Sequence, residues 1–128
     1  MRNIVVSVRN GLLSEAIIRA LNNGGEFQTY QVSTDTRICI PDQCKTICAD
    51  ILLMEVSYTP GTTVETRMDD IRQLRATNPG CRIALLCDDQ SAPEIAYKIT
   101  QLKKDRLIDA FFYTSVSESY LLSALASL

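Results

Sequence analysis

Histidine and tryptophan are absent from the chain, and the lack of histidine excludes several kinds of chemistry. Without histidine there can be no Ser-His or Cys-His nucleophile pair and no phosphohistidine carrier. No CxxC pair occurs, so a zinc site would have to be assembled from scattered thiolates. The cysteines are odd in number and no secretion signal is found, which favours free thiols in a reducing compartment. They are Cys39, Cys44, Cys48, Cys81 and Cys87.

Long hydrophobic runs and a strong charge of one sign are also missing. No stretch approaches the roughly 20 apolar residues of a membrane span, and the apolar part of the N-terminus is too short for a signal peptide. We therefore expect a cytoplasmic protein. The net charge of −2 gives no reason to expect direct nucleic-acid binding. The basic residues between positions 98 and 106 are interpreted as the solvated side of a helix.

Two kinds of segment alternate along the chain, whose 128 residues predict a single domain over residues 1–128. Five short apolar and β-branched runs predict strands, at 3–8, 27–33, 50–56, 82–87 and 107–114. Segments of helical spacing follow each run, and we expect Pro41, Thr63, Ser91 and Ser117 at or near helix starts. The last predicted helix reaches the end of the sequence, so we expect no output domain within it.

The predicted strands indicate the fold class. The middle runs, "DILLMEV" (50–56) and "RIALLC" (82–87), are almost continuously apolar. Strands covered by helices on both faces have this composition, whereas a half-exposed antiparallel sheet would alternate. With right-handed crossovers, the pattern predicts an α/β protein with a doubly wound five-stranded parallel sheet.

In such a sheet, functional residues gather beyond the carboxyl ends of the strands. The ends of the predicted strands carry Ser7 to Arg9, then Glu55, then Cys87 and Asp88, and finally Tyr113 to Val116. Glu55 is notable because a carboxylate there closes an otherwise apolar strand. These residues form the candidate site.

Over essentially its whole length, the chain resembles the receiver domain of bacterial two-component response regulators, the CheY-like phospho-accepting module. The resemblance is carried by five strand–helix units, by "ADILLMEVSYTPG" (49–61) and by "DAFFYTSVSESYLLSAL" (109–125). It implies the flavodoxin-like strand order 2-1-3-4-5. In the family, the third strand ends on an aspartate that receives a phosphoryl group from a histidine kinase. Two acidic residues after the first strand hold Mg²⁺, a Ser or Thr ends the fourth strand, a lysine follows the fifth, and an aromatic residue on the fifth strand moves with the switch.

The resemblance maps the family's site onto residues of different chemistry. Glu55 stands at the phosphoacceptor position, and Ser7-Val8 or Val8-Arg9 at the acidic pair. Only the switch aromatic matches the family. The remaining positions fall on Cys87 for the Ser or Thr, Val116 for the lysine and Tyr113 for the aromatic residue.

These differences imply a degenerate form, a pseudo-receiver. Mg²⁺ is held mainly by carboxylates and other oxygens, so binding of Mg²⁺ is expected to be weak or absent, and no other cofactor is expected. Phosphoryl transfer depends on neutralising charge on the moving group, so efficient self-phosphorylation is not expected, and neither is enzymatic activity. Glu55 then provides a fixed charge that holds a phosphate-independent state, or is simply a solvated carboxylate at a strand end.

Two further residues leave alternatives open. Arg9 could pair with Glu55 or Asp88 and replace the metal by a guanidinium, or it could be an ordinary surface arginine. Cys87 could be a redox-sensing thiol beside such a cation, or a plain buried cysteine. Cys44 and Cys48, spaced by four, are predicted to pack on one helix face.

The leading functional hypothesis is a signalling module that works through a protein partner, a homodimer or both. Receivers usually pair through the fourth helix, fifth strand and fifth helix, and the resemblance extends this face to the present chain. A DNA-binding output domain outside this sequence, and hence a role in transcription, is inherited from the family alone. The face would carry Tyr97, Lys98, Lys104, Tyr113, Tyr120 and Ser123.

Two alternatives remain. One is a working receiver in which Glu55 or Asp88 accepts the phosphoryl group. The other is a small flavodoxin-like ligand-binding or redox domain, although "SVRNGL" (7–12) offers just one glycine where a flavin phosphate loop would lie.

Overall fold

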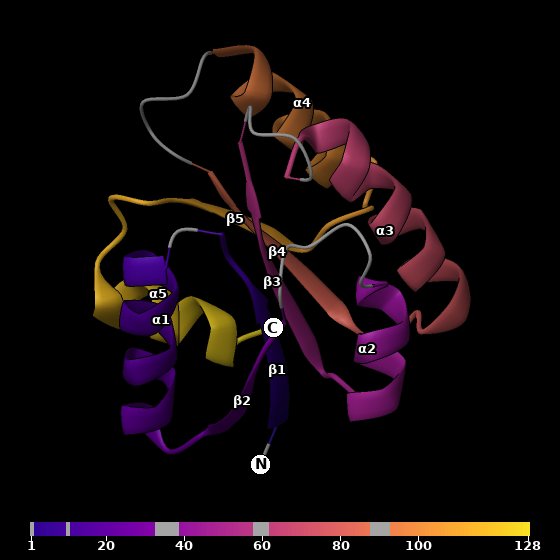
Figure 1. Cartoon of the computed structure of the whole chain (residues 1–128). Coiled ribbons are helices and arrows are strands. Elements are labelled where there is room, and N and C mark those ends of the chain that lie inside the picture. The colour runs from indigo at the N-terminus through magenta and orange to yellow at the C-terminus, as the bar shows by residue number, and fades with distance from the viewer. Residues whose placement is uncertain (1, 10, 33–38, 58–61, 88–92) are drawn as a thin grey trace.

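A computed structural model describes residues 2–9, 11–32, 39–57, 62–87 and 93–128, which form one parallel sheet flanked by helices (Figure 1). The strands lie in the order β2-β1-β3-β4-β5, and each neighbouring pair is parallel. This confirms the predicted fold class and strand order. The strands are β1 (Arg2–Ser7), β2 (Phe27–Gln31), β3 (Ile51–Val56), β4 (Arg82–Cys87) and β5 (Ala110–Tyr113).

The helices form two layers, one on each face of the sheet. On one face lie α1 (Gly11–Gly24) and α5 (Glu118–Ala126), on the left of Figure 1. On the other lie α2 (Ile40–Ile47), α3 (Val64–Thr77) and α4 (Pro93–Lys104), on the right. None of the described helices is long and apolar enough to span a membrane.

The two helical layers explain why β3 is apolar on both sides. Leu52 and Met54 pack into the core beneath α2, α3 and α4, whereas Ile51 and Leu53 pack into the core beneath α1 and α5. All four side chains are fully buried. Successive residues of a strand point to opposite faces, so a strand between two helical layers needs apolar residues at every position.

Three predicted helix starts are confirmed. Thr63 Oγ1 accepts a hydrogen bond from Thr66 N at 3.2 Å, and Ser117 Oγ accepts one from Tyr120 N at 3.2 Å. Each hydroxyl satisfies a backbone donor that the first turn of a helix leaves unpaired. Pro41 lies in the first turn of α2. Ser91 lies outside the described residues.

The last strand is shorter than predicted. Residues 107–114 were expected to form it, but β5 begins at Ala110. Leu107 N donates instead to Leu102 O at 3.0 Å, which closes the end of α4. Helix capping therefore uses the backbone of Leu107 before the strand can begin.

The prediction for the cysteines of α2 was wrong. Cys44 is buried, but Cys48 is exposed and lies past the end of α2, with a left-handed φ of 59°. A residue in this conformation ends a helix. The two thiols therefore do not share one helix face.

Candidate functional site

The carboxyl ends of β1 and β3 meet at one edge of the sheet, where Ser7 pairs in register with Met54. The next residue on β3 is Glu55, which is half-buried. Its Oε1 accepts a hydrogen bond from the backbone N of Arg9 at 3.0 Å. The structure therefore brings Ser7, Arg9 and Glu55 together, and the Glu55 carboxylate joins the end of β3 to the segment after β1.

Arg67 was not among the residues predicted from the sequence, and it lies beneath this edge. Its side chain is only 1% exposed, although it carries a full charge. Nε donates to Glu55 O at 2.9 Å, Nη2 to Ser7 O at 3.2 Å and Nη1 to Ser7 Oγ at 3.4 Å. One guanidinium from the first turns of α3 thus binds the ends of both strands.

The sequence does contain a signal for this residue. Val64, Ile71 and Leu74 form the buried stripe of α3 at helical spacing, and Arg67 stands in the same stripe. Long cations are rarely fully buried unless paired, so an arginine on an apolar stripe indicates a specific internal partner.

The charges around Arg67 compensate one another in part. Burial lowers the pKa of the Arg67 guanidinium, and the carboxylates of Asp70 and Glu55 oppose that shift. Burial likewise raises the pKa of Asp70, against the attraction of Arg67. Arginine keeps its charge in proteins. The site therefore holds a permanent internal cation next to two carboxylates.

The described residues do not fit a magnesium ion at this edge. Val8 is an apolar side chain buried in the core beneath α1 and α5. The Ser7 hydroxyl and carbonyl both face the Arg67 guanidinium, and a second cation there would be repelled. Within the described ranges, no group of three or more acidic, cysteine or histidine residues could hold a metal ion.

The other predicted site residues occupy different surroundings. Cys87 is buried at the end of β4, beside Val56, and Thr114 N donates to its carbonyl at 2.9 Å. Thr114 directly follows β5, whereas Val116 packs with the apolar core beneath α1 and α5. Asp88 lies outside the described residues. Arg9 contacts Glu55 through its backbone N, which donates to Glu55 Oε1, and not through its guanidinium as predicted.

The predicted pairing face is rich in exposed tyrosine. Tyr97 is 67% exposed, Tyr120 61% and Tyr113 41%. The Tyr113 ring stacks edge-on against Phe111, and the Tyr120 ring against Phe112. Lys98 forms a salt bridge with Glu65 of α3, with 2.7 Å between Nζ and Oε1. Lys104 is exposed at the end of α4.

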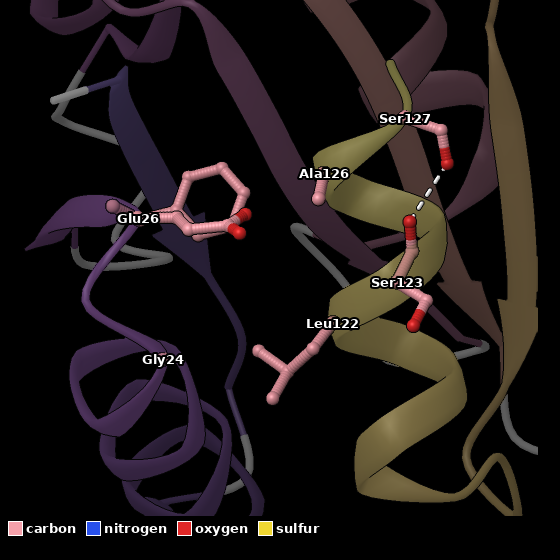
Figure 2. Close-up of a pocket in the computed structure, with 7 residues that line it drawn as sticks. Gly24, Glu26, Leu122, Ser123, Ala126 and Ser127 are labelled. Atoms are coloured by element: carbon pink, nitrogen blue, oxygen red, sulfur yellow. Dashed lines mark hydrogen bonds between the residues drawn. The ribbon is translucent and has the colours of Figure 1, made fainter.

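Ser123 lies instead in a groove of about 520 Å³ between α5 and the start of β2 (Figure 2). Leu122 and Ser123 approach this groove from α5, and Glu26 approaches it from the opposite side. Glu26 is the single titratable side chain among the described residues that line it. The lining residues therefore offer no acid–base pair, and the Arg2 guanidinium beside them donates to Ala126 O at 3.2 Å.

No protein-family model and no curated protein matches the sequence. Solved structures, in contrast, match it closely in shape. The signal receiver domain of the response regulator NarL from Mycobacterium tuberculosis aligns with a TM-score of 0.74 over 98% of this chain and 94% of that one, at 18% identity. The present chain has the receiver fold.

Two further structures with the receiver fold align equally well. A CheY-like receiver domain protein from Methanospirillum hungatei gives a TM-score of 0.73 over 99% of this chain and 92% of that one, at 11% identity. The RcsB response regulator of Salmonella typhimurium gives 0.76 over 99% of this chain at 15% identity, and the alignment spans 58% of RcsB. Identities this low establish the fold, while the chemistry has to be argued from the site.

Proposed function

We propose that the chain is a receiver-like signalling module of a two-component system that acts through protein contacts without Mg²⁺-dependent phosphorylation. The buried guanidinium of Arg67 is the observation that carries the proposal. In a working receiver, a divalent cation held by an acidic pair neutralises the incoming phosphoryl group. Here the pair falls on Ser7-Val8 or on Val8-Arg9, neither of which contains a carboxylate, and a covalently attached cation already binds the strand ends.

Glu55 supports the same proposal. Its carboxylate accepts a backbone hydrogen bond from Arg9 and lies near the charge of Arg67. The hydrogen bond from Arg9 N uses a lone pair of Glu55 Oε1 and fixes the orientation of the carboxylate. It holds the segment after β1 against β3, which is the role of a fixed structural charge.

The test is to incubate the chain with a small phosphodonor such as acetyl phosphate and with Mg²⁺, and to measure its intact mass. We expect no change in mass. RcsB, whose structure has been determined in the presence of the phosphomimetic BeF₃⁻, is the positive control for the assay. A stable gain of one phosphoryl group would contradict the proposal.

A matched variant tests whether the missing carboxylates and the Arg67 cation prevent the binding of Mg²⁺. In Ser7→Asp/Glu55→Asp/Arg67→Met, one carboxylate of the pair and the aspartate acceptor are introduced and the internal cation is removed, while Val8 keeps its place in the apolar core. We expect this variant to gain Mg²⁺ binding, read by chemical-shift changes at the strand ends. The single Glu55→Asp variant should show no chemical-shift changes with Mg²⁺, because it introduces the acceptor without the metal ligands.

A second candidate is a working receiver with Glu55 as an unusual acceptor. It is favoured by the half-buried position of Glu55 at the tip of β3. If it holds, Glu55→Gln abolishes the mass gain in the phosphodonor experiment. Transfer to Asp88 predicts instead that Asp88→Asn abolishes it.

The protein contacts are proposed to use the tyrosine-bearing face of α4, β5 and α5. Exposed tyrosines are typical of interface anchors, because they bury a large area at a small entropic cost. Partners would be a second copy of the chain, another protein or a DNA-binding output domain. Sedimentation equilibrium of the chain and of Tyr97→Glu/Tyr120→Glu tests the homodimer, with Leu12→Glu on α1 as control. Equal association in all three would exclude this face.

A further inference from the structure

A second groove, of about 410 Å³, opens beside the starts of β4 and β5, at the edge of the sheet opposite the candidate site. The net charge of the chain is −2, yet four of the side chains that line this groove are basic. The lining consists of Arg75, Arg82, Lys103, Arg106, Ile108 and Asp109.

The carboxylate among these lining residues, Asp109, is already hydrogen-bonded within the fold. Asp109 Oδ2 accepts from Arg75 Nη2 at 2.7 Å and from Ile83 N at 2.8 Å. The other nitrogens of Arg75 donate to Leu107 O at 3.1 Å and to Cys81 O at 3.0 Å. Arg75 and Asp109 are therefore a structural pair that connects the end of α3 to the starts of β4 and β5.

Three cations remain at the rim. The Arg82 side chain is 53% exposed and lies 3.5 Å from Asp109 Oδ1. Lys103 and Arg106 are exposed, and the Lys103 ammonium lies 5.8 Å from the centre of the Phe111 ring. Since Asp109 is already paired with Arg75, it compensates these three charges only in part. Four basic side chains and one carboxylate line the groove, and a concave surface with such an excess of positive charge concentrates anions.

Arg106 also occupies an unusual backbone position. It has a left-handed φ of 61°, and its N donates to Lys103 O at 3.1 Å in the turn that ends α4. Glycine is the usual residue in this turn, because a Cβ atom is disfavoured there. Cys48 is the other described non-glycine residue with a positive φ. At this groove, a strained backbone position carries a cation.

We propose that this groove binds a small phosphate-class oxyanion with several negative charges, a polyphosphate group, through Arg82, Lys103 and Arg106. Guanidinium groups match phosphate oxygens in a bidentate geometry, and lysine adds a mobile point charge. The volume falls within the range of roughly 300–1,000 Å³ that is typical of small-ligand sites. The group could belong to inorganic polyphosphate or to a nucleotide, and the experiment separates the two.

The test is a titration of the intact chain with sodium tripolyphosphate at low ionic strength, without divalent cations, followed by backbone amide chemical shifts. We expect saturable shifts at residue 82 and over 103–109. Arg82→Gln and Arg106→Gly should each weaken binding by about tenfold, as expected for one charge-assisted contact. Arg106→Gly also relieves the positive φ, so weaker binding in this variant cannot be assigned to unfolding.

Two variants serve as matched controls. Cys48→Gly makes the same backbone change at the end of α2, and Arg19→Gln removes an exposed charge from α1 on the other face of the sheet. Both should bind tripolyphosphate as the unmodified chain does. A parallel titration with adenosine triphosphate identifies the source. Equal affinity supports recognition of the polyphosphate alone, and tighter binding supports a nucleotide in the same groove.

Three outcomes would overturn the proposal. These are the absence of saturable shifts, an equal loss of binding in Arg19→Gln, and tighter binding of duplex DNA than of tripolyphosphate at the same salt. The second would mean diffuse attraction to the whole molecule, and the third would reassign the groove to a nucleic-acid backbone. The result is independent of the phosphodonor experiment, because the two sites lie at opposite edges of the sheet.

Discussion

Arg67 is a charged side chain that lies buried at the ends of two strands. A guanidinium buried across the ends of β1 and β3 satisfies Ser7 and the Glu55 carbonyl by direct hydrogen bonds. Burial removes the guanidinium from water and lowers its pKa, and the carboxylates of Asp70 and Glu55 partly offset that shift. The strand ends are therefore held by an internal cation whose charge does not depend on any ligand.

Replacing Arg67 by methionine is predicted to destabilise the chain by about 2–4 kcal/mol, because buried acceptors and Asp70 lose their partner. The measurement is urea unfolding at neutral pH. Arg72→Met, on the exposed side of the same helix, should change the free energy of unfolding by less than about 0.5 kcal/mol. Equal effects would mean that the contacts of Arg67 contribute nothing specific.

Asp70 predicts a pH dependence. Burial raises its pKa above the ordinary value of 3.8, so the folded state binds this proton more tightly than the unfolded state. The resulting stabilisation is fully present below the unfolded pKa and is lost as the pH rises through the folded pKa. The free energy of unfolding of Asp70→Asn should therefore increase relative to that of the unmodified chain as the pH rises from 3.8. A difference that stays constant over this pH range would contradict the prediction.

At the scale of single elements, local chemistry sets the ends of helices. Thr63 and Ser117 begin α3 and α5 with the same side-chain contact. Cys48 and Arg106 end α2 and α4 in the same left-handed conformation. Two helix starts and two helix ends thus offer matched pairs within one chain.

Thr63→Ala is predicted to cost about 1 kcal/mol, the usual value for a lost N-cap, and Ser117→Ala should cost a similar amount. Cys48→Gly should instead stabilise the chain by about 0.5–1 kcal/mol, because glycine adopts the left-handed conformation without strain. Chemical denaturation of the three variants is the measurement. A loss of stability in Cys48→Gly would show that its side chain makes compensating contacts.

At the scale of the whole molecule, the receiver fold is present at low sequence identity to the solved structures that share it. The sheet order and the two helical layers match solved receiver structures at TM-scores of 0.73–0.76, although identity is 11–18%. A fold tolerates such change because burial depends on the pattern of apolar residues and not on their identity. The chemistry of a site depends on individual residues.

Ligand-linked stability provides a global test of the proposed loss of metal binding. A ligand that binds only the folded state raises the unfolding temperature in proportion to the logarithm of its concentration. We predict that Mg²⁺ with BeF₃⁻ leaves the unfolding temperature of this chain unchanged. Calorimetry checks this, with RcsB as the positive control. A rise that depends on both ions would contradict the prediction.

The sequence by itself determined the fold class and most helix starts, because these depend on local patterns. Apolar runs in 50–56 and 82–87 required two covering layers, and Thr63 and Ser117 carried their capping chemistry with them. The position of Glu55 at a strand end could be predicted for the same reason. The start of β5 could not be predicted in this way, because the backbone N of Leu107 forms a hydrogen bond in the turn that ends α4.

Only the tertiary structure decided which cation serves the candidate site. Arg9 is near Glu55 in any sheet of this order, and its guanidinium was the natural candidate. The structure uses its backbone N instead and brings the Arg67 side chain from α3, 60 residues away from Ser7 in sequence. The apolar stripe of α3 signals that Arg67 has an internal partner. Which groups it binds depends on how the helix packs across two strands, and no local pattern specifies that packing.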